Sequence, residues 1–341
     1  MNKKIIAAFA ILVLAVLVAG IPLALISEYD SGSDGVQTAG NSALPDEITL
    51  DYATWSYLSL VLRDQKILED EFRDDNVKLT WVLTQGGNKT MEFLMSGSVD
   101  IGTGAGVAGI ISYINGNPIR AIYVTHVHSG EILVRADSGI NSLVDLKGRT
   151  IAATPTTNPY LFLLGVMHSV GLTKDDVNIV PLQHHDGLLA LFRGDVDAWS
   201  GGDRMAAALA TGNDADEIKS IFRGFEFITP CFLFSREEFH KKYPQAVTKI
   251  LKAYDRARQW ALDNPERYLE IVARENRIPP EMAKVMVDNN NYDINIPGEI
   301  RDSDRDSMYA SEIVLNQIVR KGTDIRKKVD ELLDRDIFRK P

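Results

Sequence analysis

One phrase occurs twice in this chain, about a hundred residues apart, and it constrains the fold more than any other feature. "GSVDIGTGAG" covers residues 97–106, and "GDVDAWSGGDR" covers residues 194–204. Each copy follows an apolar helical run, "MEFLMS" or "LLALFR", and each lies within the same order of strands, loops and helices. Glycine closes a helix because it tolerates the left-handed conformation there, and Val-Asp then begins a strand. A generic helix-to-strand turn explains a single copy, but the shared order of elements favours two similar α/β halves.

Strand-like and helical segments alternate from Ile48 onward, which is typical of βαβ units and a mostly parallel sheet. The apolar spacing predicts one helix over residues 56–72. A second helix is predicted from residue 158, with Asn158 as its N-cap and Pro159 at its first position. After residue 206 the pattern is mainly helical, and we expect this C-terminal segment to pack back on the first half.

Composition excludes several functional classes. The 341 residues carry a net charge of -10, which argues against a nucleic-acid surface. The single cysteine, Cys231, permits neither a disulfide within the chain nor a cysteine-based zinc site, and we interpret it as a core residue. Nucleophile-elbow, Walker and zinc-protease motifs are absent from the sequence. A Gly-x-Gly-x-x-Gly match at 104–109 follows the third strand instead of the first, so we interpret it as accidental.

The N-terminus predicts export. Residues 1–4 are positive, and the run from Ile5 to Ile26 carries no charge over 22 residues, enough to span a bilayer. Residues 1–26 are therefore a signal peptide or a membrane anchor, and 27–46 form a flexible linker. The sequence favours a retained anchor slightly but leaves cleavage open. In either case the rest of the chain is extracytoplasmic.

Candidate ligand contacts lie where strands end, because an open parallel sheet binds ligands outside the carboxyl ends of its strands. Loops rich in Gly, Ser, Thr and Asn lead there into helix N-termini, which suit an anion. Arg204 is the best charged candidate, since a guanidinium holds an oxyanion with two hydrogen bonds. Trp55 and Trp199 are candidate aromatic walls. His126 and His128 alternate on one strand, but nothing in the sequence makes them converge with a third metal ligand, so we predict no metal and expect hydrogen bonding from His126 or His184 instead.

Several longer phrases resemble a known family when taken together in order. They are "GGNKTMEFLMSGSVDIGTGAG", "VRADSGINSLVDLKGRTIAATP", "GLLALFRGDVDAW" and "SREEFHKKYPQAVTKILKAYDRARQWALDNPE". The chain resembles the solute-binding proteins of ABC importers, in the branch that takes aliphatic sulfonates, taurine, nitrate or a thiamine pyrimidine precursor. The resemblance implies a two-lobed type II periplasmic-binding-protein fold, in which each lobe is a mostly parallel sheet flanked by helices. Lobe 1 would comprise 47–130 and 227–341, and lobe 2 would comprise 131–226.

The resemblance also implies a mechanism and a set of contacts. The lobes would close on a small organic anion and deliver it to a permease with its ATPase, without a cofactor and without catalysis; a monomer is expected. The ligand contacts implied by position, together with the candidate wall Trp199, are Trp55, Ser56, Gly87, Asn88, Gly104, Ala105, His126, Thr156, Thr157, Trp199, Gly201 and Arg204.

Other functions stay open at this stage. The ligand could instead be a thiamine pyrimidine precursor or an aromatic carboxylate. An anchored sensor without a transporter would show the same sequence features. An enzyme built on this scaffold is disfavoured by the export segment and the single cysteine.

Overall fold

The structure is a computed structural model that describes residues 44–202, 214–288 and 292–339. The chain divides into two units, 1–41 and 42–341, and all described residues belong to the second. The predicted signal peptide or anchor therefore lies outside the described residues. Within the described ranges, no helix is long and apolar enough to cross a membrane.

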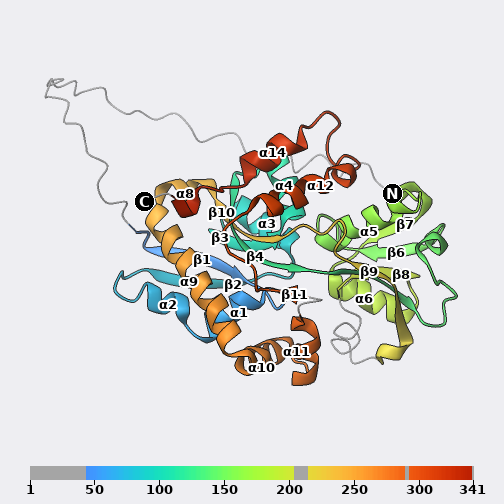
Figure 1. The fold of residues 1–341 in the computed structure, drawn as a ribbon, viewed down its shortest axis with the longest axis horizontal. Helices are drawn as coiled ribbons and strands as arrows, with labels where there is room; N and C mark the ends of the chain where they lie inside the picture. Colours follow the sequence, from blue (N-terminus) through green and yellow to red (C-terminus); the bar gives the residue numbers. More distant parts are fainter. Residues whose placement is uncertain (1–43, 203–213, 289–291, 340–341) are drawn as a thin grey trace, which may run out of the picture. The chain divides into compact units, whose positions relative to one another are not determined.

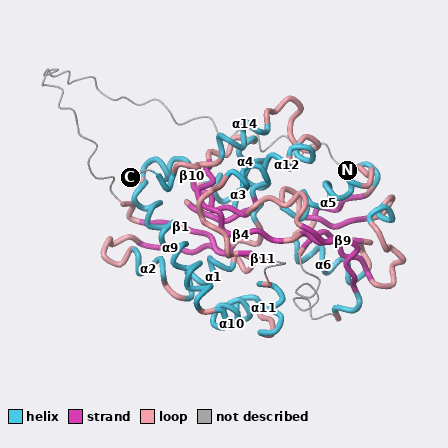
Figure 2. The backbone as a smooth tube through the Cα atoms, in the orientation of Figure 1, coloured by secondary structure: helices cyan, strands magenta, loops and turns pink. Residues whose placement is uncertain are grey.

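The strands form two sheets with helices packed around them, which confirms the α/β class (Figures 1 and 2). The first sheet has six strands in the order β11-β4-β10-β3-β1-β2. Five of them are longer than two residues. The strands are β1 (Glu47–Tyr52), β2 (Lys78–Leu83), β3 (Ile101–Ala105), β4 (Ile119–His128), β10 (Cys231–Arg236) and β11 (Tyr292–Asp293).

The second sheet has five strands in the order β7-β6-β8-β5-β9. All of them come from one continuous stretch of chain. They are β5 (Gly130–Arg135), β6 (Thr150–Ala153), β7 (Asn178–Pro181), β8 (Ala198–Gly201) and β9 (Ile218–Gly224). Two short connections join the sheets, one at Ser129 between β4 and β5 and one over residues 225–230 between β9 and β10.

Both sheets are mixed: most strands of each run in one direction, as expected, but no more than half of the neighbouring pairs in either sheet are parallel. Parallel pairing is confined to β1 with β2 and β3, and to β6 with β7 and β8. Strand β10 runs antiparallel between β3 and β4, and β5 runs antiparallel to both β8 and β9. The cause is the pair of connections: β5 and β10 each enter their sheet directly from the other one, so neither arrives through a helical crossover that would make it parallel.

The repeated phrase builds the same local structure in both halves. Gly97 and Gly194 close their helices at φ +75° and +76°, as predicted. Asp100 then accepts a hydrogen bond from the Thr49 N–H at 3.0 Å and returns one from its own N–H to the Thr49 carbonyl at 2.8 Å. Asp197 makes the same two bonds with Thr150, both at 2.8 Å. The phrase thus fastens β3 to β1 in the first half and β8 to β6 in the second.

Helices cover both sheets. In the first half they are α1 (Tyr57–Asp64), α2 (Ile67–Glu71), α3 (Gly87–Ser96) and α4 (Gly106–Ile114), and in the second α5 (Asn158–Ser169) and α6 (His184–Arg193). The single helix predicted over 56–72 is broken, because Lys66 adopts a left-handed φ of 52°. The predicted N-cap Asn158 is instead the first residue of α5; Thr157 is the cap residue and Pro159 follows at the second position.

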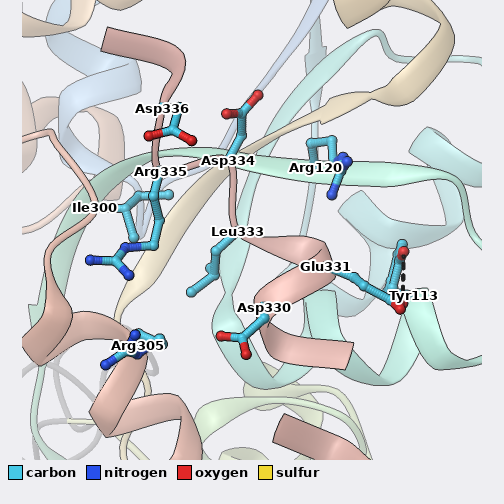
Figure 3. Close-up of a pocket in the computed structure, with 10 residues that line it drawn as sticks. All are labelled: Tyr113, Arg120, Ile300, Arg305, Asp330, Glu331, Leu333, Asp334, Arg335 and Asp336. Atoms are coloured by element: carbon cyan, nitrogen blue, oxygen red, sulfur yellow. Dashed lines mark hydrogen bonds between the residues drawn. The ribbon is translucent and has the colours of Figure 1, made fainter. Parts of the chain in front are cut away.

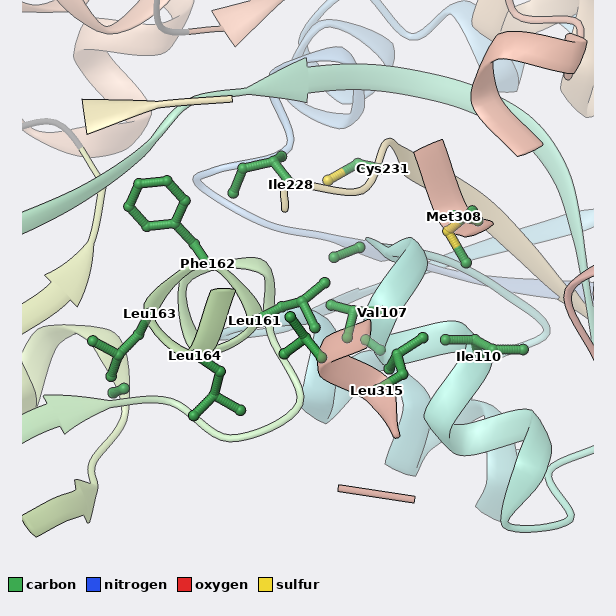
Figure 4. Close-up of a cluster of buried hydrophobic side chains, with 14 of the residues drawn as sticks. Val107, Ile110, Leu161, Phe162, Leu163, Leu164, Ile228, Cys231, Met308 and Leu315 are labelled. Carbon is green, nitrogen blue, oxygen red and sulfur yellow. The ribbon is translucent and has the colours of Figure 1, made fainter. Parts of the chain in front are cut away.

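The C-terminal segment packs on the first half, as expected: α9 contacts α1 and α2, and α14 contacts α4. Its helices are α8 (Glu237–Lys242), α9 (Pro244–Asp263), α10 (Pro265–Asn276), α11 (Pro280–Val287), α12 (Asp302–Ala310), α13 (Glu312–Leu315) and α14 (Ile325–Leu332). One of them also reaches the second half. Leu315 of α13 lies in the same apolar cluster as Val107 of α4 and Leu161 of α5 (Figure 4). This cluster is a core shared by both halves.

Candidate functional site

A pocket of about 650 Å³ lies between the loops at the ends of the two sheets. Residues from the loop after β1 and from β2, β3 and β4 form most of one wall, and residues from α5, α6 and β8 form the other. The first wall includes Thr54, Trp55, Tyr57, Leu83, Thr84, Gln85, Gly86, Gly87, Ala105, Ala108, His126, His128 and Ser129, and the second includes Thr157, Asn158, Pro159, Gln183, His184, His185, Asp186, Leu188, Trp199, Gly201 and Gly202. Cys231, Met286 and Tyr292 complete the lining.

Five helices begin at this pocket. The first turns of α1, α3 and α4 reach it from one wall, and those of α5 and α6 from the other, since each helix has its first residue or its cap residue in the lining. A helix N-terminus leaves backbone N–H groups without intrahelical partners and carries a partial positive charge. Helix starts on facing walls therefore create a site that suits an anion or a polar group rich in acceptors.

Charged side chains contribute little to the described lining. It contains no lysine or arginine, and Asp186 is its only carboxylate. A buried cation stands close by: Arg258 of α9 donates through Nη2 to the Val124 carbonyl of β4, and through Nε to the Tyr123 hydroxyl at 3.1 Å. The charge of Arg258 is one of the causes that lower the pKa of His126. The lining thus relies on backbone dipoles and neutral side chains.

Three of the pocket histidines, His126, His128 and His184, are neutral at physiological pH. Burial lowers the pKa of His126 well below its ordinary value, with His128 and Arg258 adding to the effect. Burial also lowers the pKa of His128, and it lowers that of His184 to about 4. A neutral imidazole offers one donor and one acceptor nitrogen, so these rings can hydrogen-bond a ligand but supply no charge to it.

Aromatic rings form much of the first wall. The His126 ring stacks on Tyr292 with centroids 4.0 Å apart, and Tyr292 stacks on Tyr57 at 4.2 Å. Trp55 approaches His126 at 6.2 Å. On the second wall Trp199 is only 5% exposed and lies so close to Gly187 and Gly201 that a Cβ at either position would meet its ring. Small residues on both sides of this indole are therefore required by its packing.

A buried carboxylate lies behind the first wall. Asp51 at the end of β1 accepts hydrogen bonds from the Thr84 hydroxyl at 3.0 Å, the Thr90 hydroxyl at 2.8 Å and the Thr103 N–H at 2.8 Å. Burial nevertheless outweighs these bonds and raises the pKa of Asp51 to about 7. Because Thr84 itself lines the pocket, Asp51 connects the loop after β2 to the start of α3 and to β3.

The sequence-based site residues fall into three groups. Seven line the pocket: Trp55, Gly87, Ala105, His126, Thr157, Trp199 and Gly201. Four lie next to lining residues in the chain without being part of the lining: Ser56, Asn88, Gly104 and Thr156. The twelfth, Arg204, lies outside the described residues. Their role as ligand contacts stays a prediction.

Sequence reasoning missed Gln183, Asn158 and Tyr292. Gln183 is the cap residue of α6 and directly precedes His184, which the sequence analysis named as a candidate, so the search for residues at strand ends could have found it. Asn158 was interpreted as a helix cap. Tyr292 comes from a C-terminal segment that returns to pair with His128 of β4, and no local signal indicates this return. No group of three or more metal-ligating side chains converges within the described ranges.

A second cavity, of about 730 Å³, lies among β4, α4 and the C-terminal helices (Figure 3). Several of its charged side chains already have partners: Glu331 accepts from Tyr113 and Lys328, Arg335 pairs with Asp302, and Arg305 pairs with Asp306. Strand ends and helix N-termini do not meet there as they do at the first pocket. We therefore take the pocket between the two walls as the candidate ligand site.

Comparisons with known proteins agree with this architecture. Relatives from Bacillus subtilis (strain 168) and Escherichia coli (strain K12) both carry the name "Putative aliphatic sulfonates-binding protein". The first is 28% identical over 204 residues, which are 59% of this chain and 61% of that protein. The second is 22% identical over 289 residues, or 84% and 89% of the two chains.

Solved structures share the fold. The alkanesulfonate-binding protein SsuA from Xanthomonas axonopodis pv. citri, bound to MOPS, superposes with a TM-score of 0.73 at 19% identity, covering 85% of this chain and 99% of that one. At this identity the likeness establishes the fold, which is the periplasmic-binding-protein fold expected from the sequence. The profile of the family described as "NMT1/THI5 like" matches residues 71–268, which is more than half of the chain. The chain therefore belongs to the NMT1/THI5-like family.

Proposed function

We propose that this protein is the extracytoplasmic solute-binding component of an ABC importer, and that it captures a small organic anion in the pocket between its two sheets. One observation carries the proposal: the first turns of five helices, from both walls, meet at one pocket of about 650 Å³. Oriented N–H groups at helix starts bind an oxyanion, and a cationic side chain adds to this binding where one reaches the anion. The aromatic first wall favours an organic ligand over a bare inorganic ion.

The relatives support the same class of ligand. Both curated relatives are named for aliphatic sulfonates, and the SsuA structure is named for alkanesulfonate. A sulfonate has three acceptor oxygens for helix N–H groups and an alkyl part for the aromatic wall. A thiamine pyrimidine precursor or an aromatic carboxylate is the alternative ligand within the same function.

Capture would proceed by closure of two lobes, 47–130 with 227–341 and 131–226. Two short connections join the sheets, which is the arrangement of a hinge. Asn158 at the start of α5 donates to the Thr229 carbonyl at 2.7 Å, in one connection, and to His128 at 3.2 Å, beside the other. This side chain would hold the start of α5 to the hinge while the rest of the second lobe moves.

The folded part would lie outside the cytoplasm, attached to the membrane through residues 1–26 where that segment is retained. Binding alone is proposed, with no bond made or broken. A ligand recovered chemically changed after incubation with the protein would contradict this and would favour an enzyme on the same scaffold.

Titration calorimetry and thermal shift on the full-length chain test the function. The panel is ethanesulfonate, 2-aminoethanesulfonate, nitrate, benzoate and a hydroxymethylpyrimidine. We expect one-to-one binding of a sulfonate and a rise in melting temperature that grows with its concentration. If only the neutral pyrimidine raises the melting temperature, the anion assignment is wrong and the alternative ligand holds.

Arg204 provides a sharper test of the anion contact. We expect Arg204→Ala to weaken sulfonate binding by roughly tenfold or more, because a charge-assisted hydrogen bond contributes about 1.5–3 kcal/mol. The matched control is Arg193→Ala, which removes an exposed arginine paired with Asp195 at the end of α6. If the Arg204 variant and the control bind the sulfonate with equal affinity, Arg204 is not a ligand contact.

A further inference from the structure

Two histidines of the pocket, His126 and His128, stand two residues apart on β4 and differ in how their ring nitrogens are used. Both line the pocket and both are neutral. Both ring nitrogens of His128 have partners. His126 has a partner for Nδ1, but its Nε2 is buried and has no hydrogen-bond partner among the described atoms.

The His128 network fixes every proton. Its Nδ1 lies 3.0 Å from the Ser129 carbonyl, which can only accept, so Nδ1 carries the proton. Nε2 then accepts from the Asn158 amide at 3.2 Å. The second amide proton of Asn158 goes to the Thr229 carbonyl, and its oxygen accepts from the Thr229 hydroxyl at 2.7 Å. His128 therefore has nothing left to offer a ligand.

The hydrogen bonds around His126 leave its Nε2 as a free acceptor. The Thr125 hydroxyl has one proton, and it donates this proton to the Cys231 carbonyl at 3.1 Å. The His126 Nδ1, 3.1 Å from the same hydroxyl oxygen, must then be the donor to it. In a neutral ring the proton on Nδ1 leaves Nε2 with an unshared lone pair. The ring is 1% exposed and held by stacking on Tyr292, so it cannot turn to water to satisfy this nitrogen.

The facing wall also carries a buried acceptor without a hydrogen-bond partner. Gln183, the cap residue of α6, has a buried Oε1 with no partner among the described atoms. Oxygens of a simple sulfonate can satisfy N–H donors but not these two acceptors. A buried acceptor that stays unpaired in the complex costs affinity, and this is how a polar site rejects a ligand that lacks the matching group.

We infer that His126 is a specificity-determining residue that selects ligands bearing an O–H or N–H donor in addition to their anionic group. The inference rests on the proposed function. It narrows the ligand class from small organic anions to hydroxy- or amino-substituted ones, with His126 Nε2 as the acceptor of the ligand's proton.

The binding test uses two sulfonates of equal heavy-atom count, 2-hydroxyethanesulfonate and 1-propanesulfonate, which differ only by hydroxyl against methyl. The wild-type chain should prefer the hydroxy compound by about tenfold or more. His126→Phe keeps a ring for stacking but has no acceptor, and it should lose or reverse the preference. His126→Gln places an amide oxygen near the former Nε2 and should restore part of it. His168→Phe, on the exposed end of α5, is the matched control and should behave as wild type.

A second readout judges the inference without any ligand. Long-range ¹H–¹⁵N correlation spectra of the full-length chain labelled in histidine, assigned with the His126→Gln variant, should show His126 with its proton on Nδ1 and a bare Nε2. A proton on Nε2, or equal wild-type affinity for the two sulfonates, overturns the inference while leaving anion capture intact. If neither sulfonate binds, the proposed ligand class is what fails, and the spectra still decide the state of His126.

Discussion

Strands β1 and β6 hold equivalent places in the two halves, and their sequences diverge two residues after the threonine that each contributes. Thr49 and Thr150 are bonded identically to the aspartates of the repeated phrase, but the next inward position is Asp51 in one half and Ala152 in the other. The partners change with it: Thr90 and Gly102 surround Asp51, whereas Gly187 and Trp199 occupy the matching positions beside Ala152. In the first half Gly102 leaves room for the side chains of Asp51 and Thr90. In the second half Gly187 leaves room for the Trp199 ring.

This difference shows how one architecture makes two unlike walls. In the first half a Cβ at Gly102 would lie 2.5 Å from the Thr90 methyl and 3.0 Å from the Asp51 carboxyl carbon, so the space belongs to a polar cluster. In the second half a Cβ at Gly187 would lie 2.9 Å from the Trp199 ring, so the same space belongs to an indole. The first wall is held by hydrogen bonds whose strength depends on protonation, and the second by apolar packing that does not titrate.

The largest effect is expected from Trp199→Ala. Removing a buried indole should lower the free energy of unfolding by about 3–5 kcal/mol, because transfer and cavity costs add. Chemical denaturation followed by circular dichroism measures it. Trp55→Ala is the comparison, since that indole is half-buried and should cost clearly less. Equal losses for the two variants would mean that Trp199 does not hold the second wall as described.

An intermediate effect, dependent on pH, is expected from Asp51. Its pKa in the folded state is raised from 3.8 to about 7 by burial, so the stabilisation it brings is present below pH 4 and is lost as the pH rises through about 7. The free energy of unfolding falls by at most about 1.4 kcal/mol for each pH unit between 3.8 and about 7. Relative to Asp51→Asn, which does not titrate, the wild-type chain should lose stability between pH 5 and pH 8.

A second substitution sharpens the Asp51 experiment. The Thr90 hydroxyl bond lowers the pKa of Asp51, so Thr90→Val should move the pH at which stability is lost upward. Denaturation curves at a series of pH values measure both effects. The contrary outcome is a difference in unfolding free energy between wild type and Asp51→Asn that stays constant with pH. It would show that the Asp51 carboxylate remains charged throughout and that the stability of the first wall does not depend on protonation.

The smallest loss of stability is expected when the aspartate of either copy of the repeated phrase is removed. Asp100→Ala and Asp197→Ala each remove the acceptor for a strand N–H, and each should cost about 1 kcal/mol of unfolding free energy. The first should cost more, since the Asp100 side chain is 18% exposed against 38% for Asp197. Thermal denaturation of both variants checks this order. If one variant is neutral, the repeated phrase fastens only one half.

The sequence predicted those features that depend on short stretches of chain. The α/β class, the closing roles of Gly97 and Gly194 and the grouping of strand-end loops all follow from local pattern, and all agree with the structure. The break at Lys66 does not follow from it, and neither does the antiparallel direction of β10, which is set by a direct connection from the second sheet. The partners of Asn158 lie in residues far away in the chain, so its role in the connections was hidden behind an ordinary helix-start pattern.

The place of β10 in the first sheet has a consequence for synthesis and export. Strand β10 lies between β3 and β4, so the centre of that sheet is missing until residue 236 has emerged. All five strands of the second sheet lie between Gly130 and Gly224 and are available earlier. The half whose chain begins later can thus close first. Strands β3 and β4 each keep one edge unpaired until β10, a segment translated about a hundred residues after them, is available.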